Sequence, residues 1–88
     1  MMTPFGGPNY RRNADRSGQR APCAYCGKKI QDHSRATFIG VADGGGRFFN
    51  VKDDAAEERK DPAGYMGGHL LGPDCARKLK AEQPGLFT

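Results

Sequence analysis

The 88-residue chain carries a net charge of +4 and contains only 13 Val, Ile, Leu and Phe residues, with no Trp. Its length allows one small domain, and this apolar fraction lies below the roughly 20% that usually separates globular from disordered chains. No apolar run approaches the ~18 residues needed to span a bilayer, and the N-terminus lacks the apolar region of a secretory signal. We therefore expect a monomeric protein of the reducing cytoplasm, without membrane contact, that is folded with help from something other than a hydrophobic core.

The first 20 residues mix Gly, Pro, Asn, Ser and Arg and show no apolar periodicity. Such a composition predicts a flexible basic N-terminal arm over residues 1–20. The domain itself is expected to span residues 21–83, and residues 84–88 are expected to form a C-terminal tail.

The domain is predicted to begin with "CAYCGKKI" (residues 23–30), in which two cysteines and a glycine are typical of a zinc knuckle. A β-hairpin with a glycine-rich tip is expected over residues 35–51. Residues 53–64 read as an acidic surface insertion with one or two helical turns before Pro62. A short third strand is expected to end at the turn "LGPD", and "PDCARKLKAEQ" (residues 73–83) to form a closing helix, with Pro73 at its first position.

Three cysteines cannot all pair with one another, which favours a structural metal over a disulfide framework. A structural Zn²⁺ takes four tetrahedral ligands, mainly thiolates and imidazoles. Cys23 and Cys26 are predicted to supply two, and Cys75, at the start of the closing helix, the third. His69 is the first choice for the fourth ligand and His33 the rival, while Asp74 or water is a further alternative. The contrary interpretation is that the cysteines are buried free thiols.

The order of a "CAYCG" knuckle, a hairpin and a helix that brings a ligand in its first turn resembles that of treble-clef zinc fingers. "CGKKI…HS" followed by "GPDCARKL" is also similar to small treble-clef proteins of phages and actinobacteria. For a phage-like protein, the expected cytoplasm is that of the host cell. The resemblance covers roughly residues 22–82. It departs from the common pattern in which the helix supplies two ligands, because Lys78 and Leu79 cannot serve. The expected fold class is therefore small α+β, metal-stabilised and treble-clef-like.

Basic residues concentrate in the first half of the chain, which favours a polyanionic partner. The primary hypothesis is a non-enzymatic module that binds DNA or RNA, accessory to transcription, replication or phage–host processes. Tyr25, Phe48 and Phe49 are candidates for base stacking, although the two Phe residues are more simply read as core. The expected phosphate-binding residues are Arg11, Arg12, Arg16, Arg20, Lys28, Lys29, Arg35 and Arg47.

An alternative hypothesis is a protein-interaction adapter. The tail "EQPGLFT" fits Q-x-x-L-F, similar to the peptide with which bacterial replication and repair proteins dock on the sliding clamp. In that resemblance Gln83, Leu86 and Phe87 are the anchors and the clamp, or another component of the transcription or replication machinery, is the partner. The competing expectation is that Leu86 and Phe87 fold back onto the small core.

An enzyme is the least favoured class. Some treble clefs carry HNH-type nuclease sites, and Asp32, His33 and Asn50 offer residues of the right types. The closing helix, however, has no His to complete a catalytic metal site, and the carboxylates crowd into the acidic insertion. No catalytic residue is therefore assigned.

Overall fold

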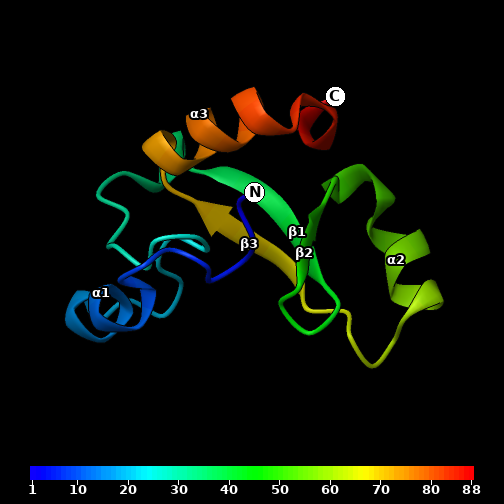
Figure 1. Ribbon diagram of the computed structural model, residues 1–88, viewed down its shortest axis with the longest axis horizontal. Coiled ribbons are helices and arrows are strands. Elements are labelled where there is room, and N and C mark those ends of the chain that lie inside the picture. Colours follow the sequence, from blue (N-terminus) through cyan, green and yellow to red (C-terminus); the bar gives the residue numbers. More distant parts are fainter.

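A three-stranded antiparallel sheet forms the centre of the computed structural model, which describes residues 1–88 (Figure 1). The strand order is β2-β1-β3, so that the hairpin partner and the later strand flank β1 on opposite sides. The regular elements are α1 (Tyr10–Ser17), β1 (Thr37–Ala42), β2 (Arg47–Phe49), α2 (Asp54–Lys60), β3 (Gly67–Leu71) and α3 (Pro73–Glu82). Three short 3₁₀ turns cover His33–Arg35, Val51–Asp53 and Pro84–Phe87. The predicted hairpin, third strand and closing helix are confirmed, and the fold is small α+β.

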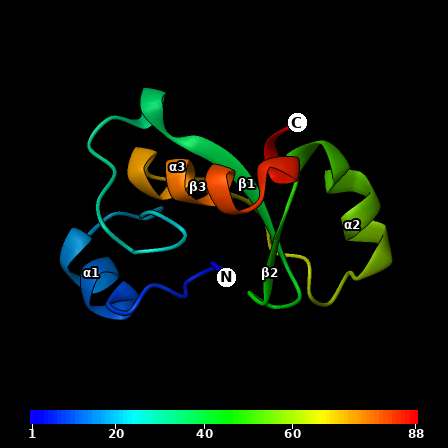
Figure 2. The same cartoon turned by 45° about the horizontal axis from the view of Figure 1, so that its top comes forward.

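The hydrophobic core lies between one face of the sheet and α3, which crosses over it (Figure 2). Ile39, Val41 and Leu71 are completely buried or nearly so, because alternate residues of a strand point to the same face. Leu79 of α3 closes this core and is also completely buried. Cys23 and Cys75 belong to the same core, so these two cysteines are part of the packing that holds α3 on the sheet.

The opposite face of the sheet is partly covered by an aromatic pair. Phe49 packs over Gly40 so closely that a side chain at position 40 would overlap its ring. The ring of Phe49 also lies 6.2 Å from that of Tyr65. Phe48 is 6% and Phe49 3% exposed, so both are core residues and neither offers a stacking face to a base.

The prediction of a flexible arm over residues 1–20 is wrong, because this segment forms α1 and packs against the knuckle. The Asn13 amide donates to the Cys26 carbonyl at 2.8 Å, and the Gln19 side chain exchanges two hydrogen bonds with the backbone of Ile30. Met2 is 8% exposed. No residue of α1 is itself buried, which explains why hydrophobic periodicity gave no sign of the helix.

The acidic segment forms a short exposed helix, as expected, and an ion pair ties it to the hairpin. Arg47 on β2 contacts Glu57 of α2 at 2.6 Å and Asp43 of the hairpin turn at 2.8 Å. Tyr65 adds a hydrogen bond to Asp54 at 2.6 Å, which raises the pKa of the Tyr65 hydroxyl to about 12. This end of the molecule therefore has its own polar anchors, separate from the cysteines.

The C-terminal tail folds back onto the domain. Leu86 and Phe87 pack against the core, and Lys80 lies over the Phe87 ring at 5.4 Å from its centroid. The buried Asn50 amide donates to the backbone carbonyls of Gly85 and Thr88, which holds the tail in place. The backfolded arrangement is thus the one observed, and Leu86 and Phe87, the anchors predicted for clamp binding, are half-buried.

Candidate metal centre

The loop that carries Cys23 and Cys26 is a tight turn closed by its own backbone. Gly27 donates to the Cys23 carbonyl at 2.9 Å, and the Cys23 amide donates to the Lys28 carbonyl at 3.0 Å. Gly27 has φ +77°, in the left-handed region that favours glycine. The amide of Ala24 is bonded to the Leu70 carbonyl at 2.8 Å, so the loop is fastened to β3. These backbone hydrogen bonds therefore fix the loop from which the Cys23 and Cys26 side chains extend.

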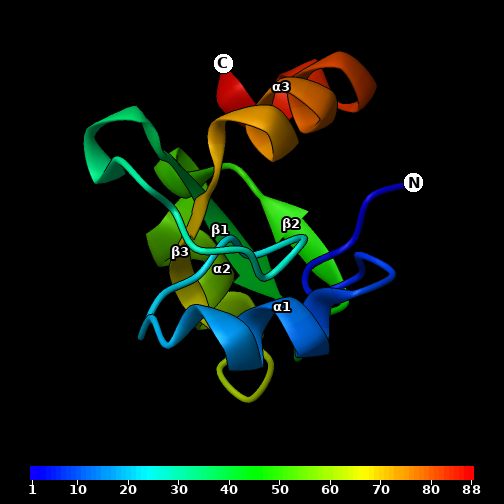
Figure 3. The same cartoon turned by 90° about the vertical axis from the view of Figure 1, so that its left-hand side faces the viewer.

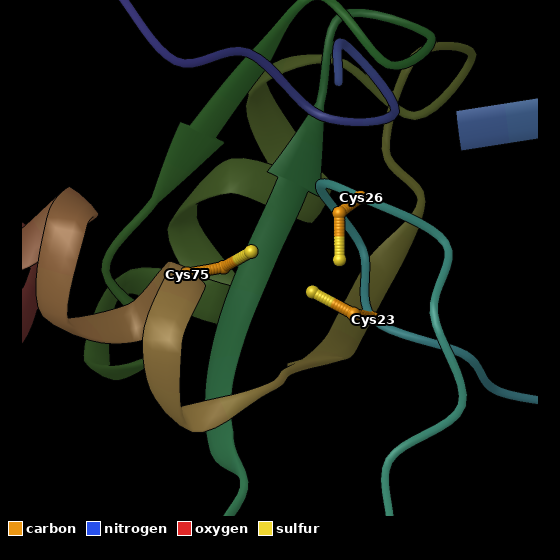
Figure 4. Close-up of side chains that lie close together, drawn as sticks. All are labelled: Cys23, Cys26 and Cys75. Carbon is orange, nitrogen blue, oxygen red and sulfur yellow. The ribbon is translucent and has the colours of Figure 1, made fainter. Parts of the chain in front are cut away.

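Cys75 approaches the same place from α3. It lies at the third position of the helix, after Pro73, and β3 and Gly72 lead the chain directly into that helix. The Sγ atoms of the three cysteines lie within 4.8 Å of one another and their side chains converge (Figure 4). Cys23 and Cys75 are buried and Cys26 is half-buried. Residues about fifty positions apart thus form one cluster with the donor atoms that bind soft and borderline metals.

Proton sharing links two of these sulfurs. The hydrogen bond from the Cys75 thiol, followed by backbone hydrogen bonds, lowers the pKa of Cys23 to about 5 against the opposing effect of burial. The same pair raises the pKa of Cys75 well above its usual range, because its proton is shared with the Cys23 sulfur and its burial disfavours a second thiolate. A cation bound among the sulfurs would replace this proton, because thiols bind metals as thiolates.

The structure does not bring either predicted histidine to the sulfurs. His69 lies on β3 opposite Ile39, where its Nε2 is 3.1 Å from the Met66 carbonyl and its ring stands edge-on to Phe5. His33 is exposed, with Nε2 3.4 Å from the Gln19 amide nitrogen. Both histidines were predicted as ligands because they lie near the cysteines in the sequence. The strand register and the contact with Phe5 instead hold the His69 ring away from the sulfurs.

A pocket of about 260 Å³ opens beside the cluster and is lined by all three cysteines. Asp32 and Asp74 also line it, but each carboxylate has another partner. Asp32 accepts hydrogen bonds from the amide and hydroxyl of Ser34, which lower its pKa. Asp74 is paired with Arg77 at 3.4 Å, and its side chain is 85% exposed. No carboxylate completes the cluster.

Three cations line this pocket, and cations of α1 and α3 line the hollows next to it. One surface hollow is shared by Arg16 of α1 with Lys28 and Lys29 of the knuckle. The same two lysines and Arg35 line the cysteine pocket. A third hollow contains Arg35 again, together with residues of α3. We call this surface the basic stripe; its members are Arg16, Lys28, Lys29, Arg35, Arg77 and Lys80.

The basic stripe includes only part of the predicted set. Arg11 and Arg12 line a neighbouring hollow with Arg16 on α1, and Arg20 is exposed just after that helix. Arg47 lines none of these hollows, and it is bound by the two carboxylates of Asp43 and Glu57. Sequence reasoning missed Arg77 and Lys80, although their spacing of three along a predicted helix could have placed them on one exposed face.

The residues considered for a nuclease site serve other contacts. Asp32 caps the turn that contains His33, and Asn50 caps the turn after β2 while its amide holds the C-terminal tail. Asp32 and Asn50 therefore have structural roles, as turn caps and, for Asn50, as an anchor of the C-terminal tail.

Comparisons with family models, curated proteins and solved structures gave no match to this chain. None of its helices has the length and apolar character required to cross a membrane. The fold and the cluster define a small α+β protein with three converging cysteines that are compatible with a bound metal ion.

Proposed function

We propose that the cysteine cluster binds one structural Zn²⁺ and that the metal-stabilised domain binds a nucleic-acid backbone along the basic stripe. Such a module acts without chemistry of its own, as an accessory to transcription or replication. The continuity of the stripe from α1, through the cysteine pocket, to α3 is the observation that carries this proposal.

Three thiols in a reducing environment support zinc as the metal. Zinc prefers sulfur and nitrogen ligands in tetrahedral geometry, and three cysteines supply most of one coordination shell. The core of this chain is small, with 17 of 88 residues buried. A metal that joins the knuckle to α3 adds a link that the apolar contacts of so small a domain can scarcely replace.

Zinc content and its response to acid test the metal. We expect one zinc per chain and loss of tertiary structure on addition of a strong chelator. Because metal binding must displace the proton held by Cys75, the affinity for zinc should fall as the pH falls. Competition with a chromophoric chelator at several pH values measures this slope, and amide chemical-shift dispersion reports the fold. A metal-free protein with a well-dispersed spectrum would show that the cysteines are only core thiols.

The charges of the protein are separated in space, which supports a polyanionic partner. Figure 1 shows α1 and α2 at opposite ends of the molecule. Arg16 on α1 belongs to the basic stripe, whereas α2 carries Asp54, Glu57 and Glu58. One surface therefore gathers most of the free cations, while the acidic residues of α2 lie at the opposite end, with Glu57 already neutralised by Arg47.

Neutralisation of the stripe should weaken nucleic-acid binding and flatten its salt dependence. We expect Arg16→Gln, Lys28→Gln and Lys29→Gln together to lower the affinity for a fluorescent oligonucleotide by at least about tenfold at low salt. If all three cations contact phosphates, the slope of log affinity against log salt should fall by about 2–3. Fluorescence anisotropy with double-stranded DNA, single-stranded DNA and RNA of equal length measures both quantities.

A matched control removes the same charge elsewhere. Lys52→Gln, Arg59→Gln and Lys60→Gln are exposed substitutions around α2, and they should leave the salt slope unchanged. Equal losses from the two triple variants would show that only net charge matters and would contradict a defined interface. The protein-interaction role of the C-terminal tail stays a prediction, since it requires Leu86 and Phe87 to leave the core.

A further inference from the structure

Phe38 is the one exposed aromatic residue of the chain. It is 62% exposed, whereas the other Phe and Tyr residues are buried or half-buried. No aromatic ring and no cation of the chain packs on its ring, since those contacts involve other residues. Of the rings predicted to stack on bases, Phe48 and Phe49 are core residues and Tyr25 is half-buried against the core. Phe38 is therefore the ring that is open to a partner.

The sheet holds this ring in a fixed place. Phe38 lies on β1, the central strand, opposite Leu70 of β3. Because successive residues of a strand point to opposite faces, its side chain lies on the face away from Ile39 and the core beneath α3. A Cβ added at Gly68 would lie 2.9 Å from the Cε1 and 3.1 Å from the Cδ1 of Phe38, with no further ring atom within 4 Å. One edge of the ring, and not a face, therefore rests on this glycine.

The basic stripe reaches the residues next to this ring. Arg35 lies three residues before Phe38, and three extended residues span at most about 11 Å. Thr37, the neighbour of Phe38, lines the hollow that this arginine shares with the cations of α3. A phosphate on Arg35 and a base on the Phe38 ring can therefore belong to the same nucleotide or to neighbouring ones.

We propose that Phe38 stacks on an unpaired base of a single-stranded nucleic acid whose phosphates lie along the basic stripe. The inference rests on the proposed function and names the class of nucleic acid that the domain prefers. Proteins that bind single strands combine a positive surface that follows the backbone with aromatic side chains on which bases stack. A duplex offers no such base face, because its bases are stacked on one another inside the helix.

The small size of the exposed surface favours a base over a protein partner. An aromatic side chain buries about 150–250 Å², whereas a stable protein–protein interface takes about 800 Å² from each partner. The neighbours of Phe38 on this face are Gly68, which has no side chain, and Leu70, which is half-buried. This surface is therefore too small to hold two copies of the chain together, while a single base covers one ring.

An abasic strand separates stacking from phosphate attraction. We expect Phe38→Ala in the full chain to lower the affinity for a fluorescent single-stranded DNA about tenfold, within the range for loss of a stacking ring. The affinity for an abasic strand of equal length and charge should stay unchanged, because only its phosphates contact the protein. Phe38→Tyr keeps the ring and should bind as the parent does. Single-stranded RNA should show the same loss, because stacking uses the base and not the sugar.

Met66→Ala is the matched control. Met66 is also exposed, at 41%, but it precedes the end of β3 that lies away from Leu70. Its replacement should leave the affinity for every strand unchanged. Equal binding of single-stranded DNA by Phe38→Ala and by the parent would overturn the inference. An equal loss with the abasic strand would assign the effect to the phosphates or to the fold, and would overturn it as well.

The ring resonances of Phe38 give a readout on the parent protein itself. Stacking on a base should shift them upfield when the single strand is added, and duplex DNA should leave them in place. Resonances that do not move at a saturating concentration of single strand would contradict the stacking contact. So would a parent dimer that Phe38→Ala converts to a monomer in sedimentation, since a second copy would then cover the ring.

Failure of this inference can be told from failure of the proposed function. A parent protein that binds neither single strand nor duplex contradicts the proposed function, and the stacking contact with it. A parent that binds both forms equally, with no effect of Phe38→Ala, contradicts only the stacking contact and leaves the basic stripe as the interface.

Discussion

Cys75→Ser is expected to leave the chain largely unfolded at neutral pH. The substitution removes the only sulfur that α3 contributes to the cysteine cluster, and a serine hydroxyl is not deprotonated under these conditions. Structural zinc contributes about 10–16 kcal/mol of apparent binding free energy in small zinc domains, which is comparable with the whole ~5–15 kcal/mol stability of a typical domain. Far-ultraviolet circular dichroism, amide dispersion and zinc content measure the loss.

The control for this variant is Lys78→Ser on the same helix. Lys78 is exposed and belongs to neither the cysteine cluster nor the basic stripe, so its replacement should cost only the helix-propensity difference, a few tenths of a kcal/mol. A Cys75→Ser protein that kept one zinc and a native spectrum would rule out the cluster as the structural centre. Loss of zinc with retention of the native spectrum would show that apolar packing suffices for the fold.

Gly27→Ala should destabilise the protein by about 2–5 kcal/mol. About 1–2 kcal/mol comes from forcing a residue with a Cβ into the left-handed region, and the rest comes from overpacking. A Cβ at position 27 would overlap the Tyr10 carbonyl and crowd the Ala14 amide, so α1 must move away from the knuckle. The midpoint of thermal unfolding, which falls by ~4–8 °C per kcal/mol in a domain of this size, measures the effect.

Gly18→Ala separates these two causes. Gly18 has φ +65° at the C-terminal end of α1, close to the φ of Gly27, but a Cβ there meets nothing within 4 Å. It should therefore cost only the conformational part, about 1–2 kcal/mol. Equal shifts of the two variants would mean that the contact between α1 and the knuckle contributes nothing to stability.

The N-terminal helix shows why sequence patterns missed part of the fold. Periodicity detects helices through a buried face, and α1 has no buried residue. Its attachment comes instead from the Asn13 and Gln19 side chains, which bond to backbone groups of the knuckle. Figure 3 shows α1 next to the loop of the knuckle. Hydrogen bonds of this kind depend on where a distant loop lies, and single-sequence reasoning has no signal for them.

The fourth ligand shows the same limit at the site. His69 was favoured because it lies six residues before Cys75 in the chain. In the antiparallel register His69 lies opposite Ile39, and its ring packs edge-on to Phe5, which belongs to the segment predicted to be flexible. Distance along the chain therefore said little about distance to the sulfurs.

By itself the sequence determined the hairpin, the third strand, the closing helix and the three cysteines, because alternation, turn glycines, Pro73 and the C-x-x-C spacing are local signals. The low apolar content also indicated that the fold needs a stabilising element other than its hydrophobic core. Only the tertiary structure decided that the three sulfurs meet, that Arg47 is occupied by carboxylates, and that Arg77 and Lys80 extend the basic stripe. These are contacts between segments far apart in the chain, and their geometry depends on how α1, the knuckle and α3 pack around the sheet.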